Sequence, residues 1–410
     1  MIRTDVRGAD PSTVRRAIVN REPLPGTRPG FPLSLAGFAG RFDGTLFRDV
    51  LGREPLFLER DARSESSGSS GSEARPAAVD WAFEPTELDD PVLFPAGVTW
   101  SPERDGGWVN RTRRWSLPTR SPEMPDAAID RLRGELAPAL GIERDGGEES
   151  LRGAPPTDDV AVAFSGGIDS ALVAAGLPDA PLYVVGFEGC HDVAAAREAA
   201  DAMDRLGDLR VIELTHETLR RAVPRVVSAT GRTNAMDVAI TIPLSIVAER
   251  AAADGYEALA VGQGADELFG GYAKVVDPAD DHRVDAGTVR GAVRETIATL
   301  PEQLARDVSA IRAAGVDVAA PFLQDRVVDA ALRLPPELLV ENGTRKVALR
   351  RFADETDAVP RSVWMAEKKA LQYGTYVSRE LDRLARRAGF KRRMDRHVDR
   401  YVESLLEDAA

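Results

Sequence analysis

One stretch of sequence decides the fold: it reads VAVAFSGGIDSALVAA and runs from Val160 to Ala175. Its apolar run from Val160 to Phe164 predicts a buried strand, and the small apolar residues after Ser170 predict a helix. Between the two, Gly166 and Gly167 let the backbone turn tightly and expose its N–H groups. The helix N-terminus adds a partial positive charge, so this turn is predicted to cradle an oxyanion such as pyrophosphate.

The loop from Ser165 to Ser170 differs from two common phosphate-binding turns. It lacks the Gly-Lys-Ser/Thr ending of a Walker loop and the spacing of the dinucleotide-binding fingerprint. Ser165 and Ser170 add hydroxyl donors to the backbone N–H groups. An ordinary glycine-rich turn is the alternative interpretation, but the position of the whole hexapeptide between a strand and a helix favours an anion site.

Strand-like and helical patterns alternate around this loop. We expect strands at 160–164, 182–187, 210–214 and 258–262, and helices at 169–176, 191–205 and 242–254. This alternation predicts an α/β fold with a parallel sheet flanked by helices. From about residue 285 the chain is rich in Ala, Leu, Arg and Glu with helical spacing, so we expect one unit over 158–410 with a helical C-terminal part.

The first 120 residues have a different character. Short apolar stretches broken by Gly and Pro predict a small β-rich unit over 1–120, with a flexible polar insertion at about 61–75. Residues 121–157 are expected to hold one helix, at 125–140, followed by a linker rich in Gly, Glu and Pro.

The composition limits the class of protein. The chain has 410 residues, a formal net charge of −13 and one cysteine, Cys190, so no intrachain disulfide framework is expected. No apolar run approaches the ~18 residues that span a bilayer, and the first residues lack an apolar leader. We therefore expect a cytoplasmic protein with no membrane partner. The acidic balance disfavours nucleic acid as a partner.

Lysine is scarce in this chain. The five lysines are Lys274, Lys346, Lys368, Lys369 and Lys391, and the other basic residues are arginines. An acidic, lysine-poor surface stays soluble in strong salt, which suggests a salt-adapted, halophilic host. Stability that rises into molar KCl would support this hypothesis, and loss of structure there would refute it.

A second glycine-rich motif reads VGQGADELFGGY from Val261 to Tyr272. It follows a predicted strand, so it should lie at the same carboxyl edge of the sheet as the first loop. Gly262 and Gly264 permit close backbone approach to a ligand. The adjacent acids Asp266 and Glu267 provide hard oxygen ligands that suit Mg²⁺ beside a polyphosphate.

The two motifs resemble those of a known family. The loop at 165–170 resembles the pyrophosphate loop of the N-type ATP pyrophosphatases, also called PP-loop enzymes of the adenine-nucleotide α-hydrolase fold. The second motif resembles the signature of asparagine synthetases and β-lactam synthetases. Three later segments resemble the same family, so the likeness spans roughly 158–380: Pro321-Phe322-Leu323 with Val327-Val328-Asp329, Lys346-Val347-Ala348-Leu349-Arg350, and Pro360 with Lys368 to Gly374.

The resemblance implies roles for individual residues. Asp169 and Asp266 would hold Mg²⁺ on the phosphates of ATP. The ATP-binding residues would be Ser165, Gly166, Gly167, Asp169, Ser170, Gly262 and Gly264. The catalytic residues would be Lys368, Glu267 and Lys346. Lys368, rather than its neighbour Lys369, would stabilise the charge that develops as an acyl-adenylate collapses.

The N-terminal region departs from the family pattern. Glutamine-hydrolysing asparagine synthetases begin, after processing, with a nucleophilic cysteine, whereas residue 2 here is Ile2 and Cys190 lies within the synthetase region. The segment from Arg48 to Phe57 still resembles a strand pair of the glutaminase domain, as Phe94 to Gly97 resembles a later turn. We interpret 1–120 as a degenerate glutaminase-like remnant with a structural role.

Gln263 is a second departure. Asparagine synthetases carry glutamate at this place and β-lactam synthetases carry tyrosine. A neutral amide cannot act as a general base, so either another group takes the proton or the nucleophile or product differs. Gln324 also stands where the family usually has aspartate.

The sequence therefore predicts an ATP-dependent carbon–nitrogen ligase that resembles asparagine synthase. It would adenylate a carboxylate, aspartate being favoured, release AMP and pyrophosphate, and use ammonia rather than glutamine that it hydrolyses itself. A separate ammonia source and a homo-oligomer stay open. One alternative is an enzyme of the same fold that acts on another acid or a tRNA base, and another is a non-catalytic ATP-binding scaffold.

Overall fold

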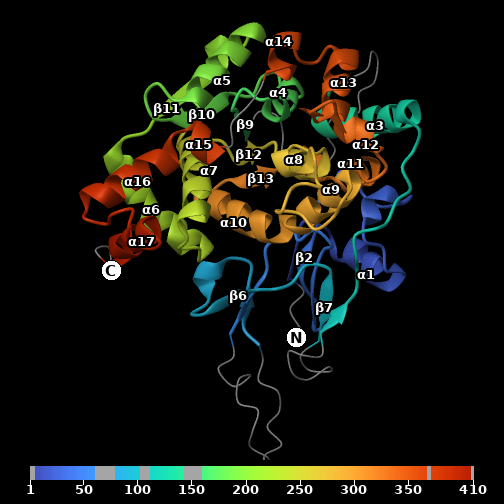
Figure 1. The fold of residues 1–410 in the computed structure, drawn as a ribbon. Coiled ribbons are helices and arrows are strands. Elements are labelled where there is room, and N and C mark those ends of the chain that lie inside the picture. Colours follow the sequence, from blue (N-terminus) through green and yellow to red (C-terminus); the bar gives the residue numbers. More distant parts are fainter. Residues whose placement is uncertain (1–4, 61–78, 102–110, 143–158, 367–370, 408–410) are drawn as a thin grey trace, which may run out of the picture.

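The central feature of the computed structural model is a five-stranded parallel sheet (Figure 1). The structure describes residues 5–60, 79–101, 111–142, 159–366 and 371–407. The strand order is β11-β10-β9-β12-β13. Their bounds are β9 Val160–Ala163, β10 Leu182–Gly186, β11 Leu209–Glu213, β12 Ala258–Ala260 and β13 Asp317–Ala319.

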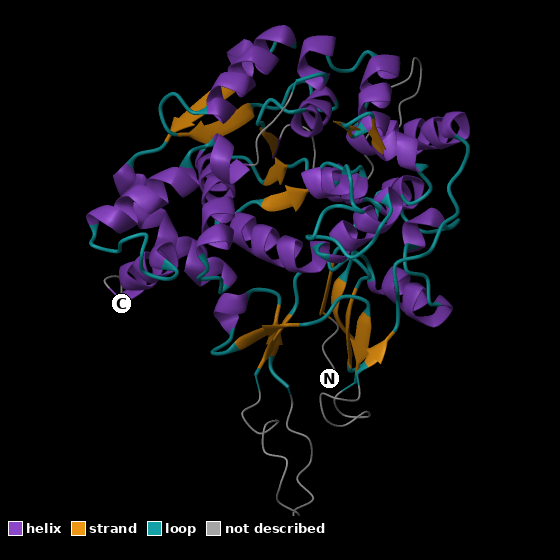
Figure 2. Ribbon diagram, in the orientation of Figure 1, coloured by secondary structure: helices purple, strands orange, loops and turns teal. Residues whose placement is uncertain are grey.

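Helices cover both faces of this sheet, as the purple helices around the orange strands in Figure 2 show. Alternate strand residues face opposite layers, since Tyr183 and Leu259 belong to one apolar cluster and Leu182 and Ala258 to the other. The first cluster includes side chains of α6 (His216–Thr230), α7 (Ala235–Ala253), α10 (Leu300–Ala313), α16 (Val377–Arg387) and α17 (His397–Glu407). The second includes those of α3 (Pro125–Leu140), α4 (Ile168–Ala175), α5 (His191–Ala202), α11 (Asp325–Ala331) and α13 (Val347–Thr356). The predicted α/β class with a parallel sheet is confirmed.

The strand order places the two glycine-rich motifs side by side. The chain runs outward from β9 through β10 to β11 and then returns to the other side of β9 at β12. In open α/β sheets, ligands bind at the carboxyl ends of the strands where the order reverses in this way. The loops after β9 and β12 therefore meet at that edge.

The C-terminal part contains elements that the sequence patterns missed. β13 completes the sheet by pairing Ala258 with Asp317 and Ala260 with Ala319, although no particular strand was predicted in the mostly helical part beyond about residue 285. A short hairpin, β14 (Val340–Glu341) with β15 (Thr344–Arg345), is a second exception. Strands of two or three residues are too short to show an alternating pattern.

The remaining helices of the α/β region are α8 (Ala265–Leu268), α9 (Val289–Ala298), α12 (Pro336–Leu339), α14 (Arg361–Trp364) and α15 (Leu371–Gly374). Its 3-10 turns are η5 (Leu206–Asp208), η6 (Ala273–Val275) and η7 (Pro321–Leu323).

The N-terminal region forms two small antiparallel sheets, which confirms its β-rich character. One sheet has the order β1-β2-β3-β7-β8, with bounds Asp5–Arg7, Ala39–Phe42, Thr45–Arg48, Val98–Trp100 and Thr112–Arg113. The other is β5-β4-β6, with bounds Trp81–Ala82, Phe57–Glu59 and Pro91–Leu93, and 3-10 turns lie at η1 (Pro25–Thr27) and η2 (Pro85–Glu87). Helix α1 (Pro11–Asn20) was not predicted. Its N-cap, Asp10, accepts hydrogen bonds from the N–H groups of Ser12 and Thr13. The expected insertion at 61–75 lies outside the described residues.

Buried charges join this region to the rest of the molecule. Arg53 donates from Nη1 to Asp325 Oδ1 at 2.6 Å and from Nε to Asp49 Oδ1 at 2.9 Å. Asp325 Oδ2 accepts the N–H of Gly26 at 2.8 Å. We call these four residues the Arg53 cluster, and the side chains of Arg53, Asp49 and Asp325 are each at most 2% exposed.

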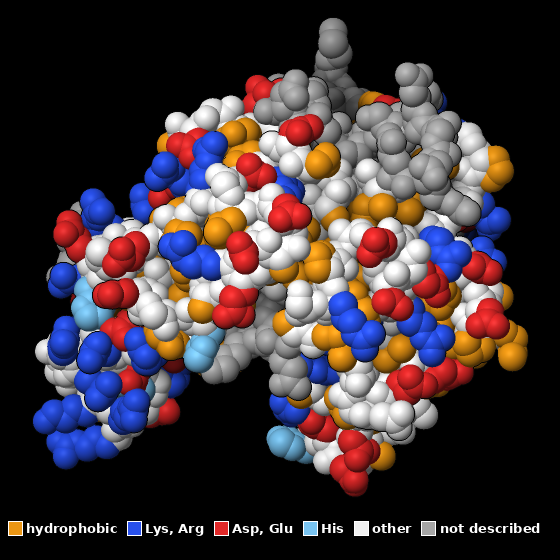
Figure 3. Space-filling view, turned by 90° about the horizontal axis from the view of Figure 1, so that it is seen from above, with side chains coloured by type: hydrophobic (Ala, Val, Ile, Leu, Met, Phe, Trp, Pro, Cys, Tyr) orange, Lys and Arg blue, Asp and Glu red, His pale blue; other side chains and the backbone are white. Residues whose placement is uncertain are grey.

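The charge on the surface is unevenly distributed. Cationic side chains gather toward the left of Figure 3, over the C-terminal helices. The exposed ones there are Arg379, Arg383, Arg386, Arg387, Lys391, Arg392, Arg393, Arg396 and Arg400. Among the described residues, no helix is both long and apolar enough to cross a membrane.

Candidate functional site

The phosphate loop lies between the end of β9 and the start of α4, as predicted. Gly166 adopts φ +75°, a conformation that favours glycine, and a Cβ there would stand 2.5 Å from Ala195 O. Gly167 precedes the first residue of α4 and occupies its N-cap position. Gly166 thus lets the loop lie close against α5.

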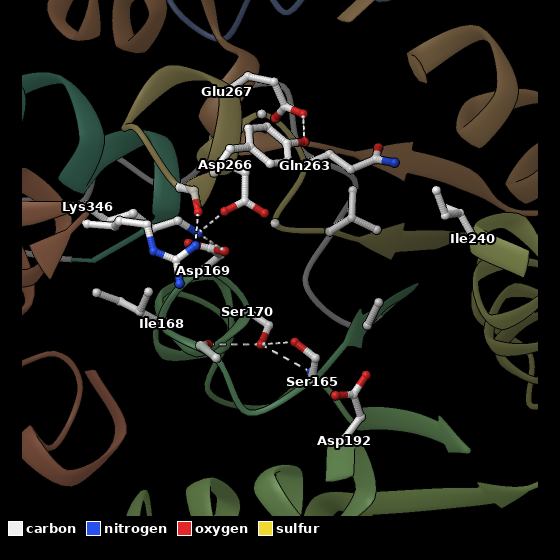
Figure 4. Close-up of a pocket in the computed structure, with 18 of the residues that line it drawn as sticks. Ser165, Ile168, Asp169, Ser170, Asp192, Ile240, Gln263, Asp266, Glu267 and Lys346 are labelled. Carbon is white, nitrogen blue, oxygen red and sulfur yellow. Dashed lines mark hydrogen bonds and ion pairs between the residues drawn. The ribbon is translucent and has the colours of Figure 1, made fainter. Parts of the chain in front are cut away.

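The two serines of the loop face each other (Figure 4). Ser165 Oγ and Ser170 Oγ are 3.2 Å apart, and Ser170 Oγ also accepts the N–H of Ser165 at 3.2 Å. Ser170 Oγ donates to Gly167 O at 3.1 Å. These bonds hold both hydroxyls in the loop before any ligand arrives, which lowers the entropic cost of binding an anion.

The second motif follows β12 and packs against the first. A Cβ on Gly262 would stand 2.9 Å from Asp169 Cβ, so only glycine allows this approach without a shift. Gly264 has φ +88° and precedes α8, which carries Asp266 and Glu267 in its first turn. The contact between Gly262 and Asp169 brings Asp169 and Asp266 to the same cavity.

Lys346 lies between these two carboxylates. Its Nζ is 2.6 Å from Asp169 Oδ2 and 2.5 Å from Asp266 Oδ1 (Figure 4). Burial acts to lower the pKa of Lys346, but the two carboxylates outweigh burial and raise that pKa above its ordinary value. Lys346 also has φ +57°, which is uncommon outside glycine and typical of residues held by their surroundings at functional sites.

Glu267 occupies the buried side of α8. Tyr272 donates its hydroxyl to Glu267 Oε1 at 2.5 Å. Burial raises the pKa of Glu267 to about 7, although the hydrogen bond from Tyr272 acts in the opposite direction. The sequence identified this residue as an acid of the site but gave no sign of its burial.

A cavity of about 1030 Å³ connects these groups. Nine of the residues expected from the sequence line it: Ser165, Gly167, Asp169, Ser170, Gly262, Gly264, Asp266, Glu267 and Lys346. Gly166 lies in the loop behind them and supports its turn. Lys368 and Lys369 lie outside the described residues, so the expected role of Lys368 stays a prediction.

The cavity also has lining residues that were not predicted to belong to the site. Arg345 donates to Gly271 O at 2.5 Å, and Arg350 donates from Nε to Arg345 O at 2.9 Å. Asp192, in the first turn of α5, is buried at the cavity wall. Arg306 and Asp307 come from α10, where two adjacent charges interrupt an apolar helix face, a pattern that could have marked them.

The donor set fits a metal ion that arrives with a nucleotide. Two carboxylates, from Asp169 and Asp266, converge on one cation, Lys346 Nζ. Within the described parts of the chain, no group of three or more His, Cys, Asp or Glu side chains could hold a metal ion. Mg²⁺ is often bound by one or two carboxylates together with substrate phosphates and water. These residues therefore suit nucleotide-bound Mg²⁺ better than a permanently held ion.

Comparison with known proteins gives a consistent result. The family model described as asparagine synthase matches residues 157–286 and 277–408. A Methanocaldococcus jannaschii protein assigned as a glutamine-hydrolysing asparagine synthetase is 28% identical over 287 residues, which are 61% of this chain and 52% of that protein. The glutamine-hydrolysing asparagine synthetase B of Escherichia coli is 25% identical over 237 residues (53% and 41%), and the nodule enzyme of Pisum sativum is 24% identical over 236 residues (52% and 39%). The chain thus spans about half the length of these relatives, or less.

Proposed function

Because the chain belongs to the asparagine synthase family, we propose that it is an ATP-dependent amide-forming ligase that activates a carboxylate as an acyl-adenylate. The observation that carries this proposal is the meeting of Asp169, Asp266 and Lys346 beside the phosphate loop. The ammonium group of Lys346 lies there between two carboxylates. This arrangement suits a metal-bound triphosphate whose charge is redistributed during the reaction.

In the first step, a carboxylate oxygen of the substrate attacks the α-phosphorus of ATP. The bond from the α-phosphorus to the bridging oxygen breaks, and pyrophosphate leaves. The N–H groups and hydroxyls of the loop from Ser165 to Ser170 hold that pyrophosphate. Asp169 and Asp266 would hold Mg²⁺, which when bound neutralises phosphate charge. Lys346 supplies a fixed cation next to the same oxygens.

In the second step, a nitrogen nucleophile attacks the acyl carbon. The C–N bond forms, AMP leaves with the electrons of the C–O bond, and the nitrogen releases a proton to solvent. Lys346 and Lys368 are the cations that we assign to the oxyanion of the tetrahedral intermediate, and Glu267 completes the proposed catalytic set.

We propose free ammonia as the nitrogen source and aspartate as the favoured acid. Cys190 is 1% exposed, and burial raises the pKa of its thiol, which suppresses the thiolate that glutamine hydrolysis requires. An acid with an apolar side chain is the second candidate. The apolar side chains of Ile240, Pro243 and Leu244 on α7, which line the cavity, favour it.

The test is detection of products by mass spectrometry. The protein is incubated in high KCl with MgATP, aspartate and either ammonium or glutamine. AMP and asparagine with ammonium, but not with glutamine alone, are the expected result, and Asp169→Asn should abolish both products. Asparagine formed with glutamine alone would contradict the nitrogen source. Absence of AMP with every acid of a broad panel would refute the ligase proposal.

A further inference from the structure

The C-terminal helices expose a surface whose charge is opposite to that of the chain as a whole. Between Arg379 and Arg400, on α16, α17 and the turn that joins them, nine side chains are both cationic and exposed, toward the left of Figure 3. In this fully described range, Asp395 is the one exposed carboxylate. The whole chain has a net charge of −13. We call these nine residues the C-terminal cationic patch: Arg379, Arg383, Arg386, Arg387, Lys391, Arg392, Arg393, Arg396 and Arg400.

Other carboxylates of this range lie beneath the arginines and hold them. Glu380, whose side chain is 4% exposed, accepts from Arg379 Nε at 2.9 Å. Asp382, whose side chain is 16% exposed, contacts Arg386 Nε at 3.1 Å and Arg392 Nη2 at 2.7 Å. The three arginine side chains stay 48–69% exposed. The acids therefore restrain the arginines without withdrawing them from solvent, which reduces the entropy that is lost when they bind a partner.

These ion pairs leave donors for a second acceptor. In Arg379, Arg386 and Arg396 the closest contact with the carboxylate is through Nε, at 2.9–3.1 Å. A guanidinium has five N–H donors in a planar fork, and a phosphate group accepts two of them at once. Arg379, Arg383 and Arg386 also recur at intervals of four and three residues, which places them along one side of α16. A row of restrained guanidinium groups suits a row of phosphates.

The patch lacks the side chains that other partners require. Among the exposed large hydrophobic side chains of the described residues, Met394 alone falls in this range. Protein interfaces depend on aromatic and apolar anchors, and helices that lie on membranes insert an apolar face. No aromatic side chain is exposed between residues 379 and 400, all of which the structure describes, so unpaired bases have no exposed ring on which to stack. The patch therefore suits a duplex, whose bases are already stacked.

We propose that the C-terminal cationic patch binds the phosphate backbone of a double-stranded nucleic acid without reading its base sequence. None of its nine residues is among those that line the cavity, so this surface is distinct from the candidate functional site. The acidic balance of the whole chain disfavours such a partner, but a duplex meets only the face that it contacts. The inference goes beyond the proposed function and does not depend on it.

The triple variant Arg387→Gln/Lys391→Gln/Arg393→Gln tests the patch. Its three side chains are exposed, and none forms an ion pair with a carboxylate in the described part of the chain. Binding of labelled DNA and RNA duplexes of mixed sequence is followed by fluorescence anisotropy at several KCl concentrations. Sucrose keeps the full-length protein folded at low salt without screening its charges.

For the wild type, we expect a dissociation constant on the order of 1 µM near physiological salt. In the triple variant, binding should weaken roughly tenfold or more. The slope of the logarithm of the binding constant against the logarithm of the KCl concentration should become shallower by about three, since each lost phosphate contact removes about one.

The matched control removes three exposed arginines that lie outside the patch, in Arg21→Gln/Arg113→Gln/Arg197→Gln. The change in net charge is the same, so wild-type binding by the control separates contact with phosphate from a general effect of charge. Both triple variants should keep the wild-type melting temperature and the wild-type rate of carboxylate-dependent exchange of labelled pyrophosphate into ATP. If the patch variant loses structure, its three single variants replace it, each with a slope shallower by about one.

Three results would overturn the proposal. One is an equal loss of binding in the two triple variants. Another is a wild-type protein that binds neither duplex, or binds with no dependence on salt. The third is tighter binding of a single strand, of polyglutamate or of phosphatidylserine vesicles than of the duplexes, which would assign the patch to a different partner.

Discussion

Lys346 is the residue on which the site depends. Its ammonium lies between Asp169 and Asp266, the two proposed metal ligands, and its backbone is held at a positive φ at the start of α13. The strain costs of order 1 kcal/mol and persists because the two ion pairs and the burial of the side chain hold it. Lys346 therefore links the stability of the metal-free protein to the chemistry of the site.

Replacing Lys346 should make the protein more responsive to magnesium. In Lys346→Met the carboxylates of Asp169 and Asp266 face each other without a cation, so we expect a loss of about 1–3 kcal/mol in the free energy of unfolding. Added Mg²⁺ should then raise the melting temperature more than in the wild type, because it binds only the folded site. Thermal unfolding with EDTA or with Mg²⁺ measures this, and exposed Lys391→Met is the control. Equal shifts in the variant and the wild type would exclude the proposed metal ligands.

Glu267 should make stability depend on pH. Its pKa is raised to about 7 in the folded protein, so it keeps a proton that the unfolded chain gives up above its ordinary value of 4.5. The contribution of this proton to the free energy of unfolding is therefore present at low pH and is lost as the pH rises through 7. At 1.36 kcal/mol per pKa unit, the free energy of unfolding should fall by up to about 3 kcal/mol over this range of pH. The Glu267→Gln variant should not show this fall.

Denaturant unfolding of metal-free protein between pH 4 and 8 would measure this effect. The control is Glu257→Gln on an exposed side chain, which should follow the wild-type curve. If the Glu267→Gln curve also ran parallel to the wild-type curve, the assigned burial of the carboxyl would be wrong.

At the level of single residues, the sequence predicted which side chains gather but not how they pair. The two glycine-rich motifs predicted the phosphate loop from Ser165 to Ser170 and placed Asp169 and Asp266 in the site. In the sequence, Lys346 is 177 positions from Asp169 and 80 positions from Asp266. Gln263 and Asp307, which also form a hydrogen bond, are 44 positions apart. No local pattern encodes such distances.

At the level of elements, the site is a junction between two strand-to-helix turns. The turn after β9 carries Asp169 on α4, and the turn after β12 brings Gly262 against it. Both turns were predicted because a buried apolar run followed by glycines is a strong local signal. Helix α6 was not predicted because Pro224 interrupts its helical pattern. Strand β13 was not predicted because it has only three residues.

Gly262→Ala should separate the two turns. A Cβ 2.9 Å from Asp169 Cβ forces the start of α4 away, at a cost of about 1–3 kcal/mol in the free energy of unfolding. We expect the rate of pyrophosphate exchange to fall at least tenfold, since the phosphate loop moves with α4. The control is Gly134→Ala in α3, where the added methyl meets open space and should stabilise the helix by up to about 1 kcal/mol. An active Gly262→Ala enzyme would show that the close approach is dispensable.

At the level of the whole molecule, the Arg53 cluster joins the N-terminal region to the α/β core that follows it. Arg48 reinforces it, because this fully buried guanidinium donates to Pro301 O at 2.8 Å. The family-like segment from Arg48 to Phe57 was noticed in the sequence, but its partner Asp325 was not. The structural role proposed for residues 1–120 gains support from these contacts, and their origin as a glutaminase remnant stays a proposal.

Arg53→Met should destabilise the whole chain. Removing the guanidinium leaves Asp49 and Asp325 as buried carboxylates, which costs about 3–5 kcal/mol. Arg60→Met is the control because the pair of Arg60 with Asp90 is more than half exposed and should contribute at most about 1 kcal/mol. Denaturant unfolding followed by tryptophan fluorescence compares the two. A loss in Arg53→Met no larger than the control would mean that the N-terminal region is not fastened through this cluster.

The Arg53 cluster also sets an order of events during synthesis. Arg53 and Asp325 are 272 residues apart in the chain. A ribosome that adds 5–20 residues per second completes Arg53 roughly 14–54 s before Asp325. During that interval the nascent N-terminal region has Asp49 but not the second carboxylate that neutralises its arginine. Its final docking therefore waits until most of the polypeptide has been translated.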